Sequence, residues 1–274
     1  MIAIFGLKLG VDFRGGSVLE LFFNTDRPAI KDVAILISAV KPVSDVAVTP
    51  VGDKNLIVRL NEINEVTHQT ILTDLKNKYP KVVENRFDSV GPTVGNELKN
   101  NSIWAVGILL VVISIYIAYV FRKMSRILSS WAMGTAAIVA MFHDVLIPVG
   151  VFVLLGRFKG VEISAVFVAA ILTIIGYSVS DTVVVFDRVR ENVLRFGSKE
   201  GFSQIVHKSI MQTLSRSINT NITVLLSLIA IFFFGGENIK YFALALIIGI
   251  FLGAYSSIFV ASPILVWWSN KRGR

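Results

Sequence analysis

The stretch ISAVFVAAILTIIGYSVSDTVVVF, Ile163–Phe186, contains a single charged residue, Asp181. A helix needs about 20 mostly apolar residues to cross a hydrocarbon core of about 30 Å, and this stretch is long enough. It therefore predicts a membrane-spanning helix that carries a carboxyl group inside the membrane.

Four other stretches are as long and as apolar. The composition agrees, because 54% of the 274 residues are hydrophobic and 17% are charged, against roughly 45–50% and about 25% in soluble domains. The mean hydropathy is +0.68. We therefore expect a polytopic α-helical membrane protein whose further full spans lie near residues 103–121, 131–156, 217–236 and 241–268.

Met1–Leu9 is also apolar, but a helix of this length rises only about 14 Å, roughly half a bilayer. It lacks the charged start and the cleavage site of a signal peptide. We interpret residues 1–9 as the remnant of a truncated first span, left by a misplaced start codon or by a fragment. The alternative is a short interfacial segment.

The net charge of +8 lies entirely with the spans. Residues 1–100 hold 12 acidic and 12 basic residues, whereas residues 101–274 hold 7 acidic and 15 basic residues, which disfavours nucleic-acid binding. By the positive-inside rule the most basic loops are cytoplasmic. The C-terminus is therefore expected inside the cell, and residues 10–100 outside the cytoplasm. The basic residues assigned to the cytoplasm are Arg122, Lys123, Arg126, Arg188, Arg190, Arg195, Lys199, Lys208, Arg216, Lys271, Arg272 and Arg274.

Residues 10–100 predict one small extracytoplasmic α+β domain with the order β-α-β-β-α-β. Gly52-Asp53 is a turn signal between the second and third strands, and Pro80 ends the second helix. This order is that of the split βαβ, ferredoxin-like fold. The expected strands are 17–24, 46–50, 55–60 and 82–88, and the expected helices are 28–40 and 64–79.

Two glycine-rich segments, Gly10–Ser17 and Gly91–Gly95, stand where this domain meets the membrane. The first nearly matches a phosphate-binding loop, but Gly16 replaces the Lys and a strand follows instead of a helix, so nucleotide binding is rejected. We interpret both segments as tight turns. The predicted turn residues are Gly10, Asp12, Gly15, Gly16, Gly91 and Pro92.

Asp181 is the main functional candidate, since an ionisable group inside a span costs about 2.5–3.5 kcal/mol on insertion scales. Arg216, at the start of the next span, is its natural partner. One interpretation is a static buried ion pair that joins two helices. The other is a carboxyl group that gains and loses a proton, because burial opposes its charge and a nearby Arg favours it.

His143 and Asp144 are two further ionisable residues in a span. Adjacent residues cannot share one helix face, so one of the two could be a packing group. Facing polar stretches on the third and fourth full spans imply a polar or hydrated path between them. The candidate path residues are His143, Asp144, Ser178, Ser180, Thr182, Asn219 and Asn221.

The sequence DRVREN follows the Asp181 span directly, and we interpret it as a solvated cytoplasmic helix end. Gly249–Gly253 is a GxxxG pattern that allows close helix packing. The polar residues of the cytoplasmic motif are Asp187, Arg188, Arg190, Glu191 and Asn192.

Catalytic and metal chemistry find no support in the sequence. Without cysteine the chain has no disulfide, thiolate metal site, iron–sulfur cluster or cysteine nucleophile. His68, His143 and His207 fall in three different environments, and no Ser/His/Asp set is evident. We therefore expect a non-enzyme without metal or cofactor.

The chain resembles the SecF branch of the SecD/SecF family of protein-export membrane proteins, within the resistance–nodulation–division superfamily. The resemblance extends over nearly the whole chain, and IIGYSVSDTVVVFDRVREN is its most specific part. Family members have six spans, and most of the first is missing here. The matching stretches are Gly10–Ser17, Gly91–Leu98, His143–Val145, Ile174–Asn192, Gln212–Arg216, Phe234–Gly236 and Tyr255–Ser262.

The resemblance implies a subunit of the bacterial cytoplasmic membrane that pairs with SecD and acts on the SecYEG channel, often with YajC. Such a complex uses the proton motive force, not ATP, to promote export of a preprotein. By resemblance Asp181 is the proton-relay carboxylate and Arg216 is the arginine of that relay. SecD would supply another carboxylate across the interface.

Two alternatives remain open at the level of the sequence. A proton-driven small-molecule or lipid exporter of the same superfamily would be expected to have larger external domains and two repeats. A non-conducting structural partner would use Asp181 and Arg216 only to hold helices together.

Overall fold

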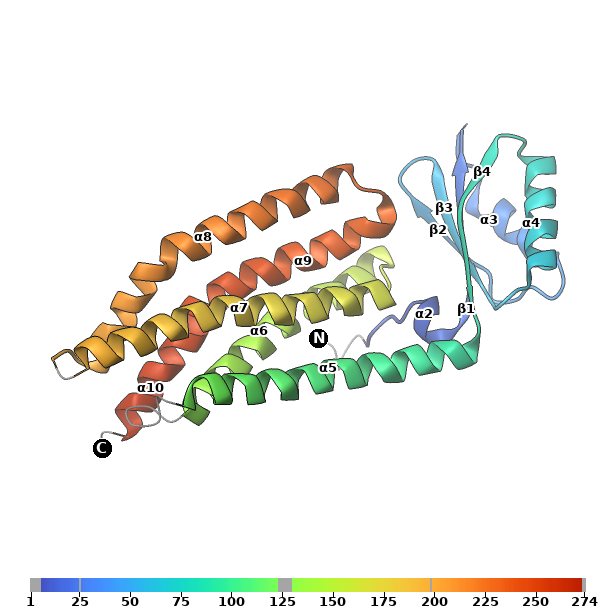
Figure 1. Cartoon of the computed structure of the whole chain (residues 1–274). Coiled ribbons are helices and arrows are strands. Elements are labelled where there is room, and N and C mark those ends of the chain that lie inside the picture. Colours follow the sequence, from blue (N-terminus) through green and yellow to red (C-terminus); the bar gives the residue numbers. More distant parts are fainter. Residues whose placement is uncertain (1–5, 25, 123–129, 198, 273–274) are drawn as a thin grey trace. The chain divides into compact units, whose positions relative to one another are not determined.

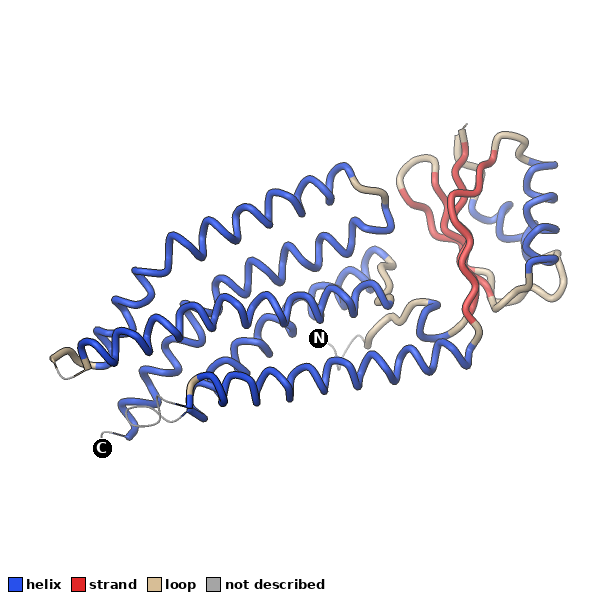
Figure 2. The backbone as a smooth tube through the Cα atoms, in the orientation of Figure 1, coloured by secondary structure: helices blue, strands red, loops and turns tan. Residues whose placement is uncertain are grey.

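A computed structural model describes residues 6–24, 26–122, 130–197 and 199–272. The described chain divides into two compact units, which we call the membrane unit (residues 104–154 and 166–272) and the sheet unit (residues 7–103 and 155–165). Figure 2 shows that the strands all belong to the sheet unit. Residues 1–5 of the predicted span remnant and residues 123–129 of the first basic loop lie outside the described residues.

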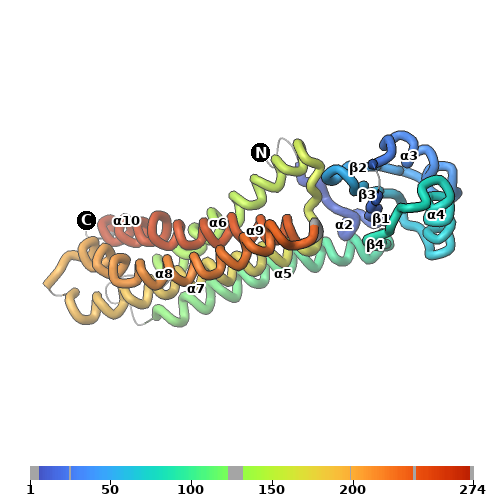
Figure 3. Tube along the Cα trace, turned by 90° about the horizontal axis from the view of Figure 1, so that it is seen from above, coloured from blue at the N-terminus to red at the C-terminus, as the bar shows by residue number. Residues whose placement is uncertain are grey.

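Long apolar helices make up the membrane unit, and five of them are long and apolar enough to cross a membrane. This confirms the predicted class of polytopic α-helical membrane protein. Figures 1 and 3 show α6, α7, α8 and α9 running along one another. The helices are α5 (Pro92–Val120), α6 (Ser130–Lys159), α7 (Ala165–Phe196), α8 (Phe202–Phe234), α9 (Glu237–Ser256) and α10 (Ser262–Arg272).

Three helices extend well beyond their apolar runs. α5 begins at Pro92 although its apolar run begins at Ile103. α7 continues past Phe186 to Phe196, and α8 begins at Phe202 although its apolar run begins near Ser217. The extension of α7 is charged, and its ion pairs lie at helical spacing: Asp187 with Arg190 and Glu191 with Arg195. Such pairs stabilise a helix outside the membrane, where apolarity no longer marks it.

The last span is not a uniform α-helix. A π-helical segment, η2 (Ser257–Ala261), separates α9 from α10. α9 lies close against α7 at its glycines, because a Cβ on Gly249 would fall 2.3 Å from Ile174 and one on Gly253 would fall 3.2 Å from Ser178. The predicted packing role of the GxxxG pattern is therefore confirmed.

The sheet unit has the predicted ferredoxin-like topology. Its four strands are β1 (Gly16–Phe23), β2 (Ala47–Val51), β3 (Asn55–Leu60) and β4 (Val82–Val90), and they form an antiparallel sheet in the order β2-β3-β1-β4. The helices α3 (Ile30–Ser38) and α4 (Glu65–Lys78) lie on the same side of the sheet in Figure 1. Each element lies within a few residues of its predicted range.

The core of the sheet unit lies between the sheet and these two helices. Alternate strand residues such as Leu19, Leu21 and Val58 are buried there with Ile37 of α3 and Ile71 of α4. Alternation in the strands and spacings of three or four in the helices place apolar side chains on one face of each element. The fold follows from that pattern.

The two glycine-rich segments lie against each other. A short helix, α2 (Val11–Arg14), stands between Gly10 and Gly15, and β1 starts directly at Gly16. Gly15 has a φ of +77° and a Cβ there would lie 2.8 Å from Pro92, while Gly16 has a φ of +123°. Only glycine fits such positions easily, so Gly15 and Gly16 form a tight backbone turn as predicted. The predicted turn at Gly91–Gly95 is wrong, because Pro92–Gly95 begin α5.

Residues 155–165, which comprise the end of α6, the connection and the first residue of α7, belong to the sheet unit rather than to the membrane unit. Leu9 pairs with Ile163 in an isolated parallel bridge. Arg59 of β3 donates from Nε to Glu162 Oε2 at 2.9 Å. The carboxylate of Asp12 accepts from the backbone N–H of Ala165 at 2.8 Å. The sequence-based boundary at residues 10–100 did not include this connection.

Candidate functional site: two carboxylates in the membrane unit

Asp144, on α6, is completely buried, with 0% of its side chain exposed. Its Oδ2 accepts hydrogen bonds from Ser178 Oγ of α7 at 2.5 Å and from Ser256 Oγ of α9 at 2.6 Å. Its Oδ1 lies 2.9 Å from Nδ1 of His143. Three helices therefore supply polar partners to one carboxyl group in an apolar surrounding.

His143 and Asp144 contact each other although adjacent positions do not share one helix face, and their role in a polar path stays a prediction. Successive side chains leave a helix about 100° apart, but the imidazole reaches back to its neighbour. His143 is 29% exposed and stacks on Tyr255, with ring centroids 6.2 Å apart. The imidazole therefore connects the buried carboxyl group to the surface of the membrane unit.

Asp181, on α7, is half-buried and is held by two hydroxyl groups. Ser217 of α8 donates to Oδ1, and Ser257 Oγ donates to Oδ2 at 2.8 Å. Among the residues that the structure describes, no basic side chain forms an ion pair with Asp181. The hydrogen bonds that the described residues give to a charge here come from neutral donors.

The two carboxyl groups are linked through consecutive residues. Ser256 ends α9 and Ser257 begins η2, and each donates to a different carboxylate. Each hydroxyl also has a second acceptor on its own helix: Gly253 O lies 3.2 Å from Ser256 Oγ, and Ala254 O lies 3.0 Å from Ser257 Oγ. A hydroxyl has one proton, so it can serve only one of its two acceptors fully at a time.

Arg216 does not contact Asp181 in the way that the sequence suggested. It is exposed on α8, and within the described ranges it forms no ion pair. The reason is the helical repeat: one residue later is about 100° around the helix, and there Ser217 faces Asp181. The proton-relay role of both residues stays a prediction.

The other predicted path residues divide into two groups. Ser178 and Thr182 are buried, whereas Ser180 and Asn219 are exposed. Asn221 is buried and donates to Ser217 O at 2.7 Å. Two buried polar atoms of the membrane unit, Tyr177 Oη and Asn221 Oδ1, have no hydrogen-bond partner among the described residues.

The motif Asp187–Asn192 is more than a solvated helix end. Asn192 is 1% exposed, and its amide donates to Ser209 Oγ and to Gln212 Oε1 of α8, both at 2.8 Å. Arg188 donates to the same Gln212 oxygen at 2.6 Å. This network fastens the ends of α7 and α8 to each other.

A separate polar cluster lies in the sheet unit. His68 is buried, stacks on Phe87 with centroids 3.8 Å apart, and contacts Glu84 at 2.9 Å and Glu65 at 3.2 Å. Hydrogen bonds from Gln69 and then His68 lower the pKa of the exposed Glu65 carboxyl below its ordinary value of 4.5.

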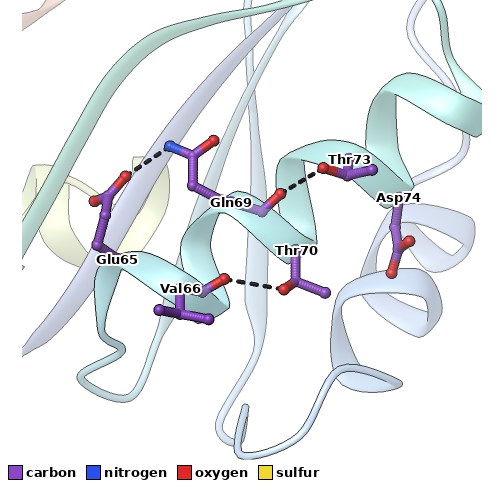
Figure 4. A pocket seen from close by; sticks show the side chains of 6 residues that line it. All are labelled: Glu65, Val66, Gln69, Thr70, Thr73 and Asp74. Carbon is purple, nitrogen blue, oxygen red and sulfur yellow. Dashed lines mark hydrogen bonds between the residues drawn. The ribbon is translucent and has the colours of Figure 1, made fainter.

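Figure 4 shows the shallow hollow beside this cluster on α4. The hydroxyls of Thr70 and Thr73 are bonded to carbonyls of their own helix, Val66 O and Gln69 O. Among the described residues, no group of three or more His, Cys, Asp and Glu side chains could hold a metal ion. We assign no chemistry to this surface.

Sequence reasoning missed Ser217, Ser256 and Ser257 as site residues. A signal was available, because Tyr255-Ser256-Ser257 interrupts an apolar span and lies just after the GxxxG pattern. Serine is common in spans, however, and its partner depends on how neighbouring helices are rotated. The missing information was the packing of α9 on α7.

Comparison with known proteins gives the chain its relatives. It matches the family described as "Protein export membrane protein SecD/SecF, C-terminal" over residues 70–271, and the "SecD/SecF GG Motif" over residues 1–24. A "Protein translocase subunit SecF" of Thermobaculum terrenum is 45% identical, with 98% of this chain and 87% of the relative covered. A "Protein translocase subunit SecF" of Anaerolinea thermophila is 40% identical, with 100% and 88% covered.

Longer relatives contain this chain as one part. A "Protein translocase subunit SecDF" of Brucella abortus is 36% identical, with 99% of this chain and 35% of the relative covered. The crystal structure of SecDF from Thermus thermophilus, described as a translocon-associated membrane protein, has a TM-score of 0.81 at 33% identity. The alignment covers 98% of this chain and 35% of that one, so the chain spans about a third of the solved protein.

Proposed function

Since the chain belongs to the SecD/SecF family of protein-export membrane proteins, we propose that it is the SecF-type subunit of a protein-export complex. In this proposal it works in the bacterial inner membrane with SecD, and the complex uses the proton motive force to promote preprotein export through SecYEG, often with YajC. The chain carries out no covalent chemistry and needs no cofactor.

The observation that carries the proposal is the setting of Asp181. An ionised carboxyl group in a span is costly, and the two contacts of Asp181 are neutral hydroxyls rather than a cation. A static structural charge would be expected to have a cationic partner within its own unit. Hydroxyls can donate to a carboxylate and accept from a carboxylic acid, so they suit a group that changes its protonation state.

The driving force is sufficient to shift a helix equilibrium. One proton that crosses a potential of 100 mV releases about 2.3 kcal/mol. In our proposal protonation of Asp181 changes the hydrogen bonds that hold α7 to α8 and to η2. The start of α7 is bonded to Asp12 of the sheet unit through Ala165, which offers a route by which such a change reaches the external domain.

A polar stripe on α8 supports a helical partner. Arg216, Asn219, Thr220, Thr223 and Ser227 are exposed at spacings of three and four residues, so they share one face of a helix that is otherwise apolar here. A charged residue on a span faces a protein interior or a water-filled cavity rather than lipid. SecD helices are the partner that the fused SecDF relatives suggest, and Arg216 would find its counter-charge there.

The proposal also includes the orientation. The cytoplasmic side holds the C-terminus, the α7–α8 connection and the motif Asp187–Asn192, because these segments carry most of the Lys and Arg residues. Residues 10–100 lie on the extracytoplasmic side, where they meet the emerging preprotein. Lipid surrounds the apolar faces of the spans.

The test is gradient-driven export in cells or membrane vesicles that depend on this chain. We expect Asp181→Asn to abolish the stimulation by the proton gradient while the protein accumulates in the membrane. The matched control is Asp187→Asn, which changes an exposed carboxylate on the same helix and should leave export near its normal rate. Unchanged export in Asp181→Asn would contradict the relay role.

Two outcomes favour the alternatives instead. Loss of proton-coupled efflux of a small molecule or lipid, with export intact, would indicate an exporter of the same superfamily. If Asp181→Asn only lowers complex stability and a stabilising temperature restores export, the residue serves a structural role.

A further inference from the structure

Asp144 has no place in the relay proposed above, yet it is buried more deeply than any other carboxyl group described in the membrane unit. Burial of this kind is kept only where hydrogen bonds compensate, and Asp144 has three such contacts from three helices. We propose that Asp144 is a second proton-binding carboxyl group, and that Ser256 and Ser257 couple its protonation to that of Asp181. This inference deepens the proposed function and rests on it in taking Asp181 as a proton site.

The coupling depends on the two acceptors of each serine hydroxyl. While Asp144 is ionised, Ser256 donates its proton to Oδ2. When a proton binds Oδ2, the new carboxylic O–H donates to Ser256 Oγ, and the serine proton turns to Gly253 O, which lies within reach at 3.2 Å. The same exchange is available at Asp181 with Ser257 and Ala254 O. No covalent bond of the serine breaks in either case.

Both exchanges act on one short segment of helix. The carbonyls of Gly253 and Ala254 precede the π-helical segment, and π-helical turns occur frequently at functional sites. Ser262 Oγ donates to Ser257 O at 2.8 Å and occupies a carbonyl of the same turn. A change of partner at Ser256 therefore alters the hydrogen bonding of the segment that presents Ser257 to Asp181.

Charge gives a second coupling. Two carboxylates held by consecutive residues repel each other, so ionisation of one favours protonation of the other. The other titratable or charged groups around the pair are His143 on α6, Tyr177 on α7, Tyr255 on α9 and Arg216 on α8. Within the described residues, only His143 of these four forms a hydrogen bond with either carboxylate. The imidazole of His143 is the group placed to exchange a proton with Asp144.

The test is infrared spectroscopy of the full chain in phospholipid vesicles over a pH series. Protonated carboxyl groups absorb separately from carboxylates, and each band is assigned by its loss in Asp144→Asn or Asp181→Asn. At the pH at which Asp181 is half protonated in the wild-type chain, we expect Asp144→Asn to lower the ratio of protonated to ionised Asp181 about tenfold. The reason is that the variant lacks the negative charge of Asp144, which favours protonation of Asp181 in the wild-type chain.

Ser256→Ala is the sharper variant, because Ser256 touches Asp144 and not Asp181. We expect it to lower the protonated fraction of Asp181 several-fold in the wild-type background and to have no effect once Asp144→Asn is present. Ser256→Thr keeps the hydroxyl and should restore the wild-type ratio. Ser114→Ala is the matched control, since Ser114 Oγ donates to Leu110 O of its own helix.

Three results would overturn the inference. The first is an Asp181 band that is unchanged in Asp144→Asn. The second is an effect of Ser256→Ala that is equal in the wild-type and the Asp144→Asn backgrounds. The third is a failure of Ser256→Thr to restore the ratio of protonated to ionised Asp181. The export assay stays independent of this measurement. If export is unchanged in Asp181→Asn while the protonation of Asp144 still affects that of Asp181, only the proposed function is contradicted. If export depends on Asp181 but the two carboxyl groups titrate independently, only this inference is contradicted.

Discussion

The carboxylate of Asp12 accepts a hydrogen bond at 2.8 Å from the backbone N–H of Ala165, the first residue of α7. The first N–H groups of a helix have no partner within it, and a negative charge near them is favourable. A residue from the start of the chain therefore caps the helix that carries Asp181. The glycines on either side of α2 set the backbone that brings Asp12 there.

We predict that Asp12→Ala frees the start of α7. The loss of a helix-capping acceptor costs about 0.5–2 kcal/mol, so amide exchange at residues 165–168 should become faster. Hydrogen-exchange mass spectrometry of the full chain measures this directly. Asp12→Asn retains an acceptor and should show a smaller change, and Asp32→Ala, an exposed acidic residue in the first turn of α3, should show none. Equal exchange in Asp12→Ala and wild type would contradict the capping role.

Asn192 should be a stability determinant of the neighbouring ends of α7 and α8. Asn192→Leu removes the donor of two hydrogen bonds from a site that is 1% exposed, and we expect a loss of about 1–3 kcal/mol in the free energy of unfolding. Denaturant unfolding in detergent micelles measures it. Asp187→Asn breaks only an ion pair with Arg190 and should cost no more than about 1 kcal/mol. Similar losses in the two variants would argue against a special role for Asn192.

The Glu65 carboxyl predicts a pH effect in the sheet unit. Its pKa is lower in the folded state than its ordinary value of 4.5, so it contributes stability above pH 4.5 that is lost as the pH falls through the lowered pKa. Gln69→Leu removes the largest cause of the shift and should move the pKa up toward 4.5. Carbon-detected NMR of labelled glutamate follows this titration.

A matched variant on the same helix is Thr73→Val, which removes a hydroxyl bonded to Gln69 O and leaves the Gln69 side chain in place. The Glu65 titration should be unchanged in it. A Gln69→Leu titration that coincides with wild type would mean that His68 alone sets the shift.

The α8 polar stripe predicts a protein contact rather than a lipid contact. The chain has no cysteine, so an introduced cysteine is its only thiol. We expect Asn219→Cys to form a specific cross-link to a co-purified membrane partner when a short thiol-to-amine reagent is added. Ile222→Cys, exposed on the apolar face of the same helix about 60° from Asn219 and about 100–160° from the other stripe residues, should not. Equal cross-linking at both positions would indicate no defined interface on the stripe.

Residue type alone predicted the fold and the location of the site, but not its contacts. Local patterns predict secondary structure without knowledge of tertiary contacts. The alternation of Leu19 and Leu21 in β1 and the long apolar runs are such patterns. Asp181 and Asp144 were conspicuous because a charge in a span is rare. Which hydroxyl each carboxylate binds depends on helix rotation, and a single residue step separates Ser217 from Arg216.

The neighbouring serines show the same limit. In the sequence, Ser256 and Ser257 are ordinary small polar residues of a span. No local pattern indicates that the first binds Asp144 and the second binds Asp181. The close approach of Gly249 and Gly253 to α7 sets their position, and that is a property of two helices together. Sequence patterns identify groups that are expensive to bury, whereas packing decides what compensates them.

The π-helical segment at Ser257–Ala261 holds one residue more in its turn than an α-helix would. The extra residue allows the wide turn to occupy different positions along the helix. If the wide turn moved along the helix, the residues it passed would rotate by about 100° each while the ends of the span stayed at the same depth in the bilayer. The part of the last span between α9 and α10 can therefore rotate about the helix axis without a shift of the span along the membrane normal.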